Sequence, residues 1–524
     1  LVKKKQKSKI LQHLFILGLL VITAFPVINK FLTGQPFNNF FFLYYIFLVT
    51  PFGITLVLKN RCYVQNEIVH LPYKKIKDYK KTKYSEHSAT PFLQSIIKWM
   101  INQGFVYSIF LILIFILFIT TRIVIPAIYT GSYVDEYYHI TSGLTLIKDG
   151  SFPKINNRML DTGYRRGAHI SLLCGIFMHI FGETIFVAKM TPMFLGFLNF
   201  ILLYLILTKF IRDKCATLGA LLLFTLNPYS IFNHFYIRIY IWYEFALILT
   251  IFLFFHLIKA VRKKNWKWLA TSVVSLIILN YINYFWSYDN GKFVILLANA
   301  LLLLYVYFFE LKYLWKVKNL YKIILFLIGF LAVYLFINID IIKKINWLLS
   351  GSLSAYAREG QRFFNLFFKI NPALTTIFLI SSILLFIEKN RYKKIILGLG
   401  FILFALHLIS SPELQLTRTI LYFMPIFYLV VAITVSYLFK TKFNKFFRYS
   451  LPLILFIAVL ASHPKNFWDG PYIPGEVWYI DYKLAYSTIK QNYSDSILLA
   501  AVTQPYLSEL YGVKTDYFVD LNNL

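Results

Sequence analysis

The chain is poor in cysteine and acidic side chains, and it lacks the common nucleotide-binding patterns. Its three cysteines, Cys62, Cys174 and Cys215, show neither metal-ligand nor redox spacing. The sequence therefore indicates no disulfide framework and no cysteine-based zinc site. No P-loop and no dinucleotide-binding glycine pattern occurs, so nothing in the sequence requires a nucleotide. The long apolar runs do not alternate apolar and polar residues, which excludes a transmembrane barrel.

Apolar residues are abundant instead. They make up 58% of the 524 residues, and the mean hydropathy of +0.62 is far above that of an ordinary soluble domain. Runs of about 20 apolar residues, enough to cross a bilayer, recur from end to end. We therefore predict an all-α polytopic membrane protein with about 13 transmembrane helices. The predicted spans are residues 10–28, 39–58, 104–127, 185–207, 214–232, 240–258, 268–285, 293–311, 321–341, 372–387, 395–409, 419–438 and 449–461.

Basic residues outnumber acidic ones, 54 to 23, for a formal net charge of +31. In a soluble protein this excess would suggest nucleic acid, but no nucleic-acid-binding motif accompanies it, so we expect none as a partner. Of the 54 lysines and arginines, 34 lie in seven segments between the spans, namely residues 1–9, 59–98, 209–214, 259–267, 312–322, 389–394 and 440–448. Cytoplasmic loops carry such an excess. We therefore place these segments and the N-terminus inside, and the C-terminal tail outside.

Three parts follow from this topology. Residues 1–103 form a two-span extension with a basic cytoplasmic loop, whose lysine-rich stretch favours contact with anionic lipid. Residues 104–461 form a transmembrane module. Residues 462–524 form a small outer α/β tail that could continue beyond the last residue, with helices at 482–491 and 505–511 and strands at 496–502 and 517–521.

The apolar segment 168–182 decides which residues face outward. It has only fifteen residues, and a crossing there would turn every later basic loop outward. We therefore predict an interfacial helix on the outer leaflet. Residues 128–184 then form one large outer loop, which contains Asp135 and Glu136.

Asp135 and Glu136 are the leading candidates for chemistry. Two adjacent carboxylates beside a span are costly to place near a low-dielectric region, so such residues are functional candidates. A carboxylate there could deprotonate a hydroxyl, hold a metal or orient a sugar. The alternative is a solvated pair, or charges that complement the start of a helix expected to run to about Leu146.

Cations and aromatic residues lie at the same predicted membrane level as Asp135 and Glu136, on the outer side. Arg165, Arg166, Arg238 and Arg418 suit phosphate recognition, although snorkelling toward lipid headgroups is the alternative for each. Tyrosines and tryptophans there could stack on sugars or form an aromatic belt. Four histidines, His139, His169, His179 and His234, lack metal-site spacing, but His139 could share a helix face with Asp135. Glu244 could pair with Arg238 or complement a helix dipole.

The order of several motifs resembles one family. An Asp-Glu-x-Tyr-His motif (135–139) follows a span, then Gly-Leu-x-Leu-Ile-x-Asp-Gly-x-Phe-Pro (143–153) and an apolar helix ending in Ile-Phe-Gly (180–182). Later come Asn-Pro-Tyr-Ser (227–230), Arg-Ile-Tyr (238–240), Arg418 with Tyr422 and Pro425, and a tail segment starting Trp-Tyr-x-Asp-Tyr (478–482). Together they resemble the polyprenyl-phosphate-sugar-dependent glycosyltransferases of the GT-C superfamily. The resemblance is to the branch of protein O-mannosyltransferases and lipid A aminoarabinose transferases.

The resemblance implies a GT-C-type bundle in a prokaryotic plasma membrane and a sugar transferred from a polyprenyl-phosphate donor to a hydroxyl of a glycan, lipid or protein. Asp135 would be the catalytic base and Glu136 would orient it or the acceptor. Substrate contacts would come from His139, Tyr164, Arg165, Arg166, His169, Arg238, Tyr240, Arg418 and Tyr422. No cofactor is required, and a divalent metal is compatible. The two N-terminal spans and Arg165-Arg166, where the family often has prolines, depart from the pattern.

Two other functions fit a polytopic protein with these residues. A lipid or polysaccharide transporter would favour acidic residues at mid-bilayer in two corresponding halves, whereas most acids here fall in outer loops. A surface-polysaccharide polymerase or ligase would use a diphosphate-linked donor instead of a monophosphate-linked one.

Overall fold

The computed structural model describes residues 103–128, 132–150, 167–286, 290–310, 372–410, 416–440, 479–480, 482–493, 499–501, 513 and 517–519. The predicted N-terminal extension and the predicted spans 321–341 and 449–461 lie outside the described residues, apart from the boundary residue 103. For Asp135, Arg418 and Tyr422 the structure describes the backbone but not the side chain.

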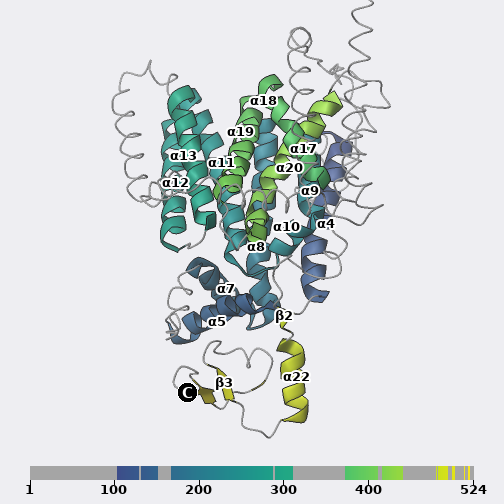
Figure 1. Ribbon diagram of the computed structural model, residues 1–524, viewed down its shortest axis with the longest axis vertical. Helices are drawn as coiled ribbons and strands as arrows, with labels where there is room; N and C mark the ends of the chain where they lie inside the picture. Colours follow the sequence, from purple (N-terminus) through teal and green to yellow (C-terminus); the bar gives the residue numbers. More distant parts are fainter. Residues whose placement is uncertain are drawn as a thin grey trace, which may run out of the picture.

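The described chain is predominantly a bundle of helices (Figure 1). Three of them are long and apolar enough to cross a membrane: α4 (Phe105–Ile128), α8 (Ile185–Ile206) with its π-helical end η1 (Leu207–Ile211), and α11 (Ile239–Lys263). They fall on the predicted spans 104–127, 185–207 and 240–258. The remaining helices of the bundle are α9 (Lys214–Leu226), α10 (Pro228–Asn233), α12 (Trp266–Trp286), α13 (Asn290–Tyr305) with η2 (Val306–Glu310), α17 (Pro372–Ile380), η4 (Ser381–Ile383), α18 (Leu384–Ile387), α19 (Arg391–Ser410) and α20 (Leu416–Lys440).

The predicted span 214–232 is wrong as a single helix, because it breaks after Leu226. Asn227 adopts an extended conformation, and its side-chain oxygen accepts a hydrogen bond of 2.9 Å from the backbone N–H of Tyr229. Pro228 favours this break, since the residue before a proline avoids helical backbone angles and proline itself fits the first position of a new helix. The short α10 then leads to the start of α11.

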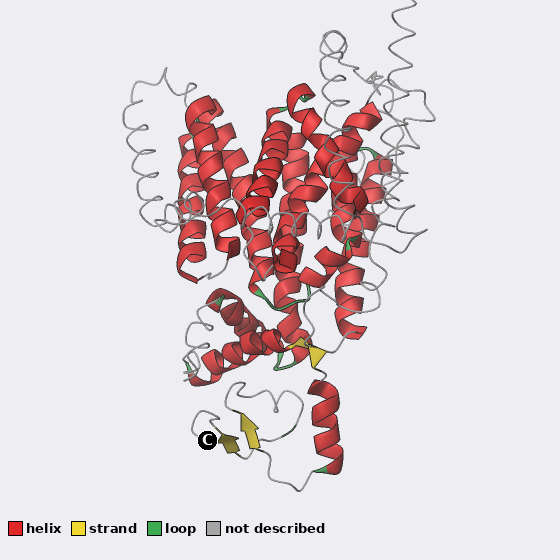
Figure 2. Ribbon diagram, viewed as in Figure 1, coloured by secondary structure: helices red, strands yellow, loops and turns green. Residues whose placement is uncertain are grey.

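Two helices, α5 (Val134–Asp149) and α7 (Ala168–Phe181), lie across one end of the bundle (Figures 1 and 2). They approach closely where Gly143 faces Gly175: a Cβ on Gly143 would lie 2.6 Å from the Ser171 carbonyl oxygen and 2.8 Å from the Gly175 nitrogen. Small residues allow such a close approach of two helix backbones. Because α5 begins at Val134, Asp135 lies within its first turn.

The core has two parts. The larger cluster fills the bundle between α4, α8, α9, α11, α13, α19 and α20. The smaller one joins the crosswise helices to the bundle and consists of Tyr137, Ile140, Leu144, Ile170, Cys174, Met178, Val187, Ala188, Leu195, Ile237 and Ile241. Side chains of α5 and α7 thus pack against α8 and the start of α11, which fixes the crosswise helices on the bundle.

Short strands connect the C-terminal residues with the start of α5. Strand β1 (Ser132–Tyr133) pairs antiparallel with β2 (Tyr479–Ile480), so that Ser132 lies opposite Ile480 and Tyr133 opposite Tyr479. Helix α22 (Tyr482–Asn492) follows, and its Tyr486 packs against the smaller core cluster. Strands β3 (Leu499–Ala501) and β4 (Tyr517–Val519) pair in parallel. The predicted helix 505–511 lies outside the described residues.

The bundle has two chemically different ends. We call the end that carries α5, α7 and the N-terminus of α11 the site end, and the opposite end the basic end. Three predicted inner segments, 209–214, 259–267 and 389–394, meet at the basic end: Lys393 Nζ lies 2.9 Å from Asp213 Oδ2, and Lys259 Nζ lies 5.9 Å from the Phe210 ring centroid. With 25 residues, α11 spans ~37 Å between the two ends.

Candidate functional site

Glu136 ties α5 to the start of α11. One of its carboxylate oxygens, Oε1, accepts a hydrogen bond of 2.9 Å from the backbone N–H of Ile237, and its side chain is 1% exposed. Ile237 precedes α11, so its backbone N–H has no acceptor within that helix. Glu136 provides the acceptor that this buried N–H needs. The contact brings the acidic pair of α5 next to Arg238.

Arg238 occupies the N-cap position of α11, with extended backbone angles (φ −142°, ψ 163°). Its side chain is half-buried, and its guanidinium carbon lies 5.8 Å from the centroid of the Tyr240 ring. Tyr240 itself is 2% exposed, so the aromatic ring provides a fixed surface beside the cation. The predicted pair Arg238 and Tyr240 is therefore assembled at the site end.

His139 joins α5 to α7 one turn after Asp135. Its Nδ1 hydrogen-bonds with the Ser171 hydroxyl at 3.0 Å, and the position of a Cβ on Gly167 would lie 3.2 Å from its Cε1. Burial, with the nearby charges of Arg238 and His169, lowers the pKa of His139 to about 3. His139 is therefore neutral at neutral pH, and it can act there as a hydrogen-bonding group but not as a cation.

His169 lies on α7 and connects it to α11, as His139 connects α5 to α7. Its ring centroid is 4.4 Å from that of Trp242 on α11. Three helix starts thus converge: that of α5 with the acidic pair, that of α7 with His169, and that of α11 with Arg238. A carboxylate and a guanidinium close to each other can take a proton and stabilise a negative charge, respectively.

The other predicted substrate contacts are placed only in part. Tyr164, Arg165 and Arg166 lie outside the described residues, although Gly167, which follows them, packs on His139. Arg418 and Tyr422 lie in the first two turns of α20. Later in α20, Tyr428 contacts Ser230 of α10 through its hydroxyl at 3.0 Å, so the N-terminal turns of α20 point toward the site end.

A buried polar network behind the site was not predicted. Glu244 Oε1 accepts hydrogen bonds from Asn199 Nδ2 at 3.1 Å and from His234 Nε2 at 3.2 Å, and its Oε2 accepts one from Asn233. Arg122 donates from Nε to His234 Nδ1 at 3.1 Å. Glu244 is thus engaged by these residues and not by Arg238, so the first of its two alternatives, pairing with Arg238, is wrong.

The sequence did contain a signal for this network. Arg122 and Lys189 stand inside predicted spans, where cations are rare and mark polar partners or function. Both are 2% exposed, and the Lys189 ammonium lies 5.5 Å from the Phe235 ring centroid. Their partners could not be named from the sequence, because they come from helices far apart along the chain.

Among the residues that the structure describes, no group of three or more His, Cys, Asp or Glu side chains could hold a metal ion. No family model matches the chain, and no curated protein is significantly similar to it.

Proposed function

We propose that this chain is a membrane glycosyltransferase that moves a sugar from a polyprenyl-phosphate donor to an acceptor hydroxyl on the outer face. The observation that carries the proposal is the hydrogen bond from Ile237 to Glu136, because it brings a carboxylate pair and Arg238 together at one end of an apolar bundle. The reaction needs one group that accepts a proton and one that stabilises a leaving phosphate.

In the proposed reaction, the Asp135 carboxylate takes the proton of the acceptor hydroxyl. The acceptor oxygen forms a bond to the anomeric carbon while the bond from that carbon to the phosphate oxygen breaks, with inversion of configuration. The electron pair leaves with the polyprenyl phosphate, whose added negative charge Arg238 stabilises. Charge-assisted hydrogen bonds from a guanidinium to phosphate are strong and geometrically specific.

Glu136 has a different role in this proposal. Because Glu136 is 1% exposed and hydrogen-bonded to the backbone of Ile237, it would anchor α5 and so position the neighbouring Asp135. His139 and Ser171 support the same turn of α5 from the side of α7. Asp135 then acts as the base and Glu136 as a positioning residue.

The wider architecture belongs to the same proposal. A bundle of about 13 spans with α5 and α7 at the outer interface would present the site to a lipid-linked donor in the outer leaflet. Arg418, in the N-terminal part of α20, would supply a second cation for the phosphate. The C-terminal residues would cover the site from outside, and the acceptor would be a glycan, lipid or protein hydroxyl.

A panel of donors tests the proposal. The purified full chain is incubated with several sugars linked to polyprenyl monophosphate and, in parallel, to polyprenyl diphosphate, and freed lipid phosphate is measured by mass spectrometry. Release of polyprenyl monophosphate supports the proposal, and release only from diphosphate donors favours a polymerase or ligase. Movement of an intact lipid-linked sugar across vesicles without any covalent product favours a transporter.

A further inference from the structure

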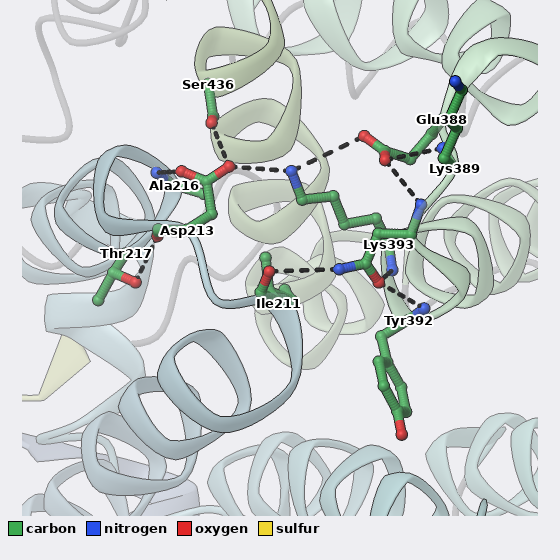
Figure 3. Close-up of polar contacts among 10 residues, drawn as sticks. Ile211, Asp213, Ala216, Thr217, Glu388, Lys389, Tyr392, Lys393 and Ser436 are labelled. Carbon is green, nitrogen blue, oxygen red and sulfur yellow. Dashed lines mark hydrogen bonds and ion pairs between the residues drawn. The ribbon is translucent and has the colours of Figure 1, made fainter. Parts of the chain in front are cut away.

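A set of polar contacts around Asp213, which we call the polar lock, connects the turn between η1 and α9 to α19 and α20 at the basic end (Figure 3). Asp213 caps α9 through the backbone N–H of Ala216 at 3.2 Å, and its other oxygen accepts hydrogen bonds from Lys393 Nζ at 2.9 Å and from the Ser436 hydroxyl. Asn390 donates to the Ile211 carbonyl oxygen at 3.3 Å. The Asp213 carboxylate is therefore engaged and cannot neutralise its neighbour Arg212.

The other carboxylates described at this end are engaged as well. Glu310 is buried and receives two hydrogen bonds from Arg262, one of them at 2.7 Å, with Arg391 at 3.8 Å. Glu388 accepts from the backbone N–H groups of Lys389 and Asn390 and lies 3.7 Å from Lys393. Glu310 is thus already paired with Arg262, and Glu388 already lies close to Lys393.

Four further cations gather beside the lock: Lys209, Arg212, Lys259 and Lys263. Within the described parts of the chain, none of them forms an ion pair with a carboxylate. Arg212 donates from Nε to the Lys209 carbonyl oxygen at 3.4 Å, and Lys259 Nζ lies 5.9 Å from the ring centroid of Phe210, the residue after Lys209. Lys263 follows Lys259 by one turn of α11. Like charges at short range destabilise each other unless an anion lies between them.

The two helices that carry these cations end in a left-handed backbone conformation. Arg212 and Lys264 have positive φ angles of 55° and 53°, and among the described residues they are the two non-glycine residues in this region. Each closes a helix C-terminus, where glycine or asparagine is usual. A helix C-terminus favours a nearby cation, but it carries only about half a negative charge. The two C-termini here cannot balance four cations.

A histidine and two tryptophans border the cluster. His256 is half-buried, lies with its ring 5.0 Å from Phe210 and 5.4 Å from Trp268, and its Nε2 has no hydrogen-bond partner in the described chain. Trp266 and Trp268 are 44% and 53% exposed. Tryptophans at this position are typical of the boundary between lipid headgroups and acyl chains.

An apolar stripe leads away from the cluster. Along α12, Val274 and Ile278 are 52% and 54% exposed, on the helix face that continues from Lys267, next to Trp268. Acyl chains can pack on such a stripe, whereas a soluble phosphate cannot use it. The charged cluster and the stripe together fit one amphipathic anion.

We propose that Lys209, Arg212 and Lys259, with His256 beside them, bind the phosphate of one anionic phospholipid whose acyl chains lie along α12. The bound headgroup reduces the repulsion among the four cations and joins the C-terminal ends of η1 and α11. This site lies ~37 Å from the site end and is independent of the proposed glycosyl transfer.

The test compares two double variants of the full chain in detergent. Lys209→Gln/Lys259→Gln removes two cations of the cluster without changing the left-handed backbone at Arg212. Lys214→Gln/Lys394→Gln removes two exposed cations from other faces of the same end, where Lys214 contacts the Gln103 carbonyl and the Tyr107 ring. Binding of phosphatidylglycerol and of phosphatidylcholine is titrated by native mass spectrometry, with and without inorganic phosphate as competitor.

We expect tight binding of phosphatidylglycerol, with an affinity lowered roughly 25-fold in Lys209→Gln/Lys259→Gln, the product of about fivefold for each lost cation, and little changed in the control variant. Phosphatidylcholine should bind weakly to all three proteins, and inorganic phosphate should not compete. Equal losses in the two variants would show a diffuse charge effect and overturn the proposal. Equal binding of both lipids, or displacement by inorganic phosphate, would also overturn it.

Discussion

The two adjacent carboxylates of α5 have different surroundings. Glu136 is buried and receives the Ile237 N–H, whereas the neighbouring Asp135 belongs to the first turn of the helix. The sequence could identify the pair as a candidate because acids beside a span are rare, but it could not separate their roles. That separation depends on a backbone amide 101 positions further along the chain.

Removing the Glu136 carboxylate should destabilise the protein. In Glu136→Ala the Ile237 N–H loses its acceptor in a buried place, so we expect a loss of about 2 kcal/mol in the free energy of unfolding. Glu136→Gln keeps an acceptor oxygen and should lose less. Lys148→Ala, which removes a partly exposed ion pair with Glu183, is the matched control on α5 and should change stability by less than about 1 kcal/mol. Denaturant or thermal unfolding measures all three, and equal effects of the Ala and Gln variants would contradict the anchoring role.

His139 should make stability depend on pH on the acid side. Its folded pKa of about 3 lies below the ordinary value of 6.5, so the unfolded chain binds a proton that the folded chain does not. The contribution of His139 to stability is therefore complete above pH 6.5 and is lost progressively as the pH falls toward 3. In His139→Asn this part of the loss disappears, so the unfolding midpoint should fall less between pH 7 and pH 5 than in the wild type. Parallel curves for the two proteins would contradict the assignment.

At the scale of elements, long apolar runs were predictable and their interruptions were not. The runs that became α4, α8 and α11 carry enough hydropathy to be found from the sequence alone. The break at Asn227-Pro228 within an apolar run was missed, because hydropathy outweighed the turn-forming pair. The crossing of α5 and α7 was also beyond sequence reasoning, since it depends on Gly143 meeting Gly175.

The glycine crossing should be sensitive to a single methyl group. In Gly143→Ala the new Cβ would lie 2.6 Å from the Ser171 carbonyl oxygen, a backbone atom that cannot move alone, so α5 and α7 must separate. We expect a loss of about 1–3 kcal/mol in stability and a comparable drop in any activity of the site. Gly219→Ala in α9, whose Cβ would meet only the Ala432 methyl group at 3.8 Å, is the control and should be neutral or stabilising. If Gly143→Ala left the stability unchanged, α5 and α7 would be further apart at their crossing than the structure has them.

The pairing of β1 with β2 can be tested by a disulfide. Ser132 and Ile480 are directly opposite each other, at a Cα separation typical of antiparallel partners and suitable for a disulfide. The variant Ser132→Cys/Ile480→Cys should form this disulfide on mild oxidation, detected as a linked peptide by mass spectrometry. The variant Ser132→Cys/Lys490→Cys, with its second cysteine near the end of α22, should not. Equal linking of both pairs would contradict the strand register.

At the scale of the whole molecule, the charge pattern predicted which segments lie together. Residues 209–214, 259–267 and 389–394 were grouped on one side only because they are basic, and Asp213, Lys259 and Lys393 do meet at one end of the bundle. Which side of a membrane that end faces stays a prediction. The partners within each end could not be predicted, because Arg122, His234 and Glu244 come from separate helices.

The role of Asp135 as the base is tested by single-turnover sugar transfer in Asp135→Asn, compared with the wild type at saturating polyprenyl-phosphate donor and acceptor. The substitution keeps the size of the side chain and removes its basicity. We predict that release of polyprenyl phosphate slows by about 10²- to 10⁴-fold while donor binding and the unfolding midpoint stay unchanged. Transfer by Asp135→Asn at the wild-type rate would contradict it.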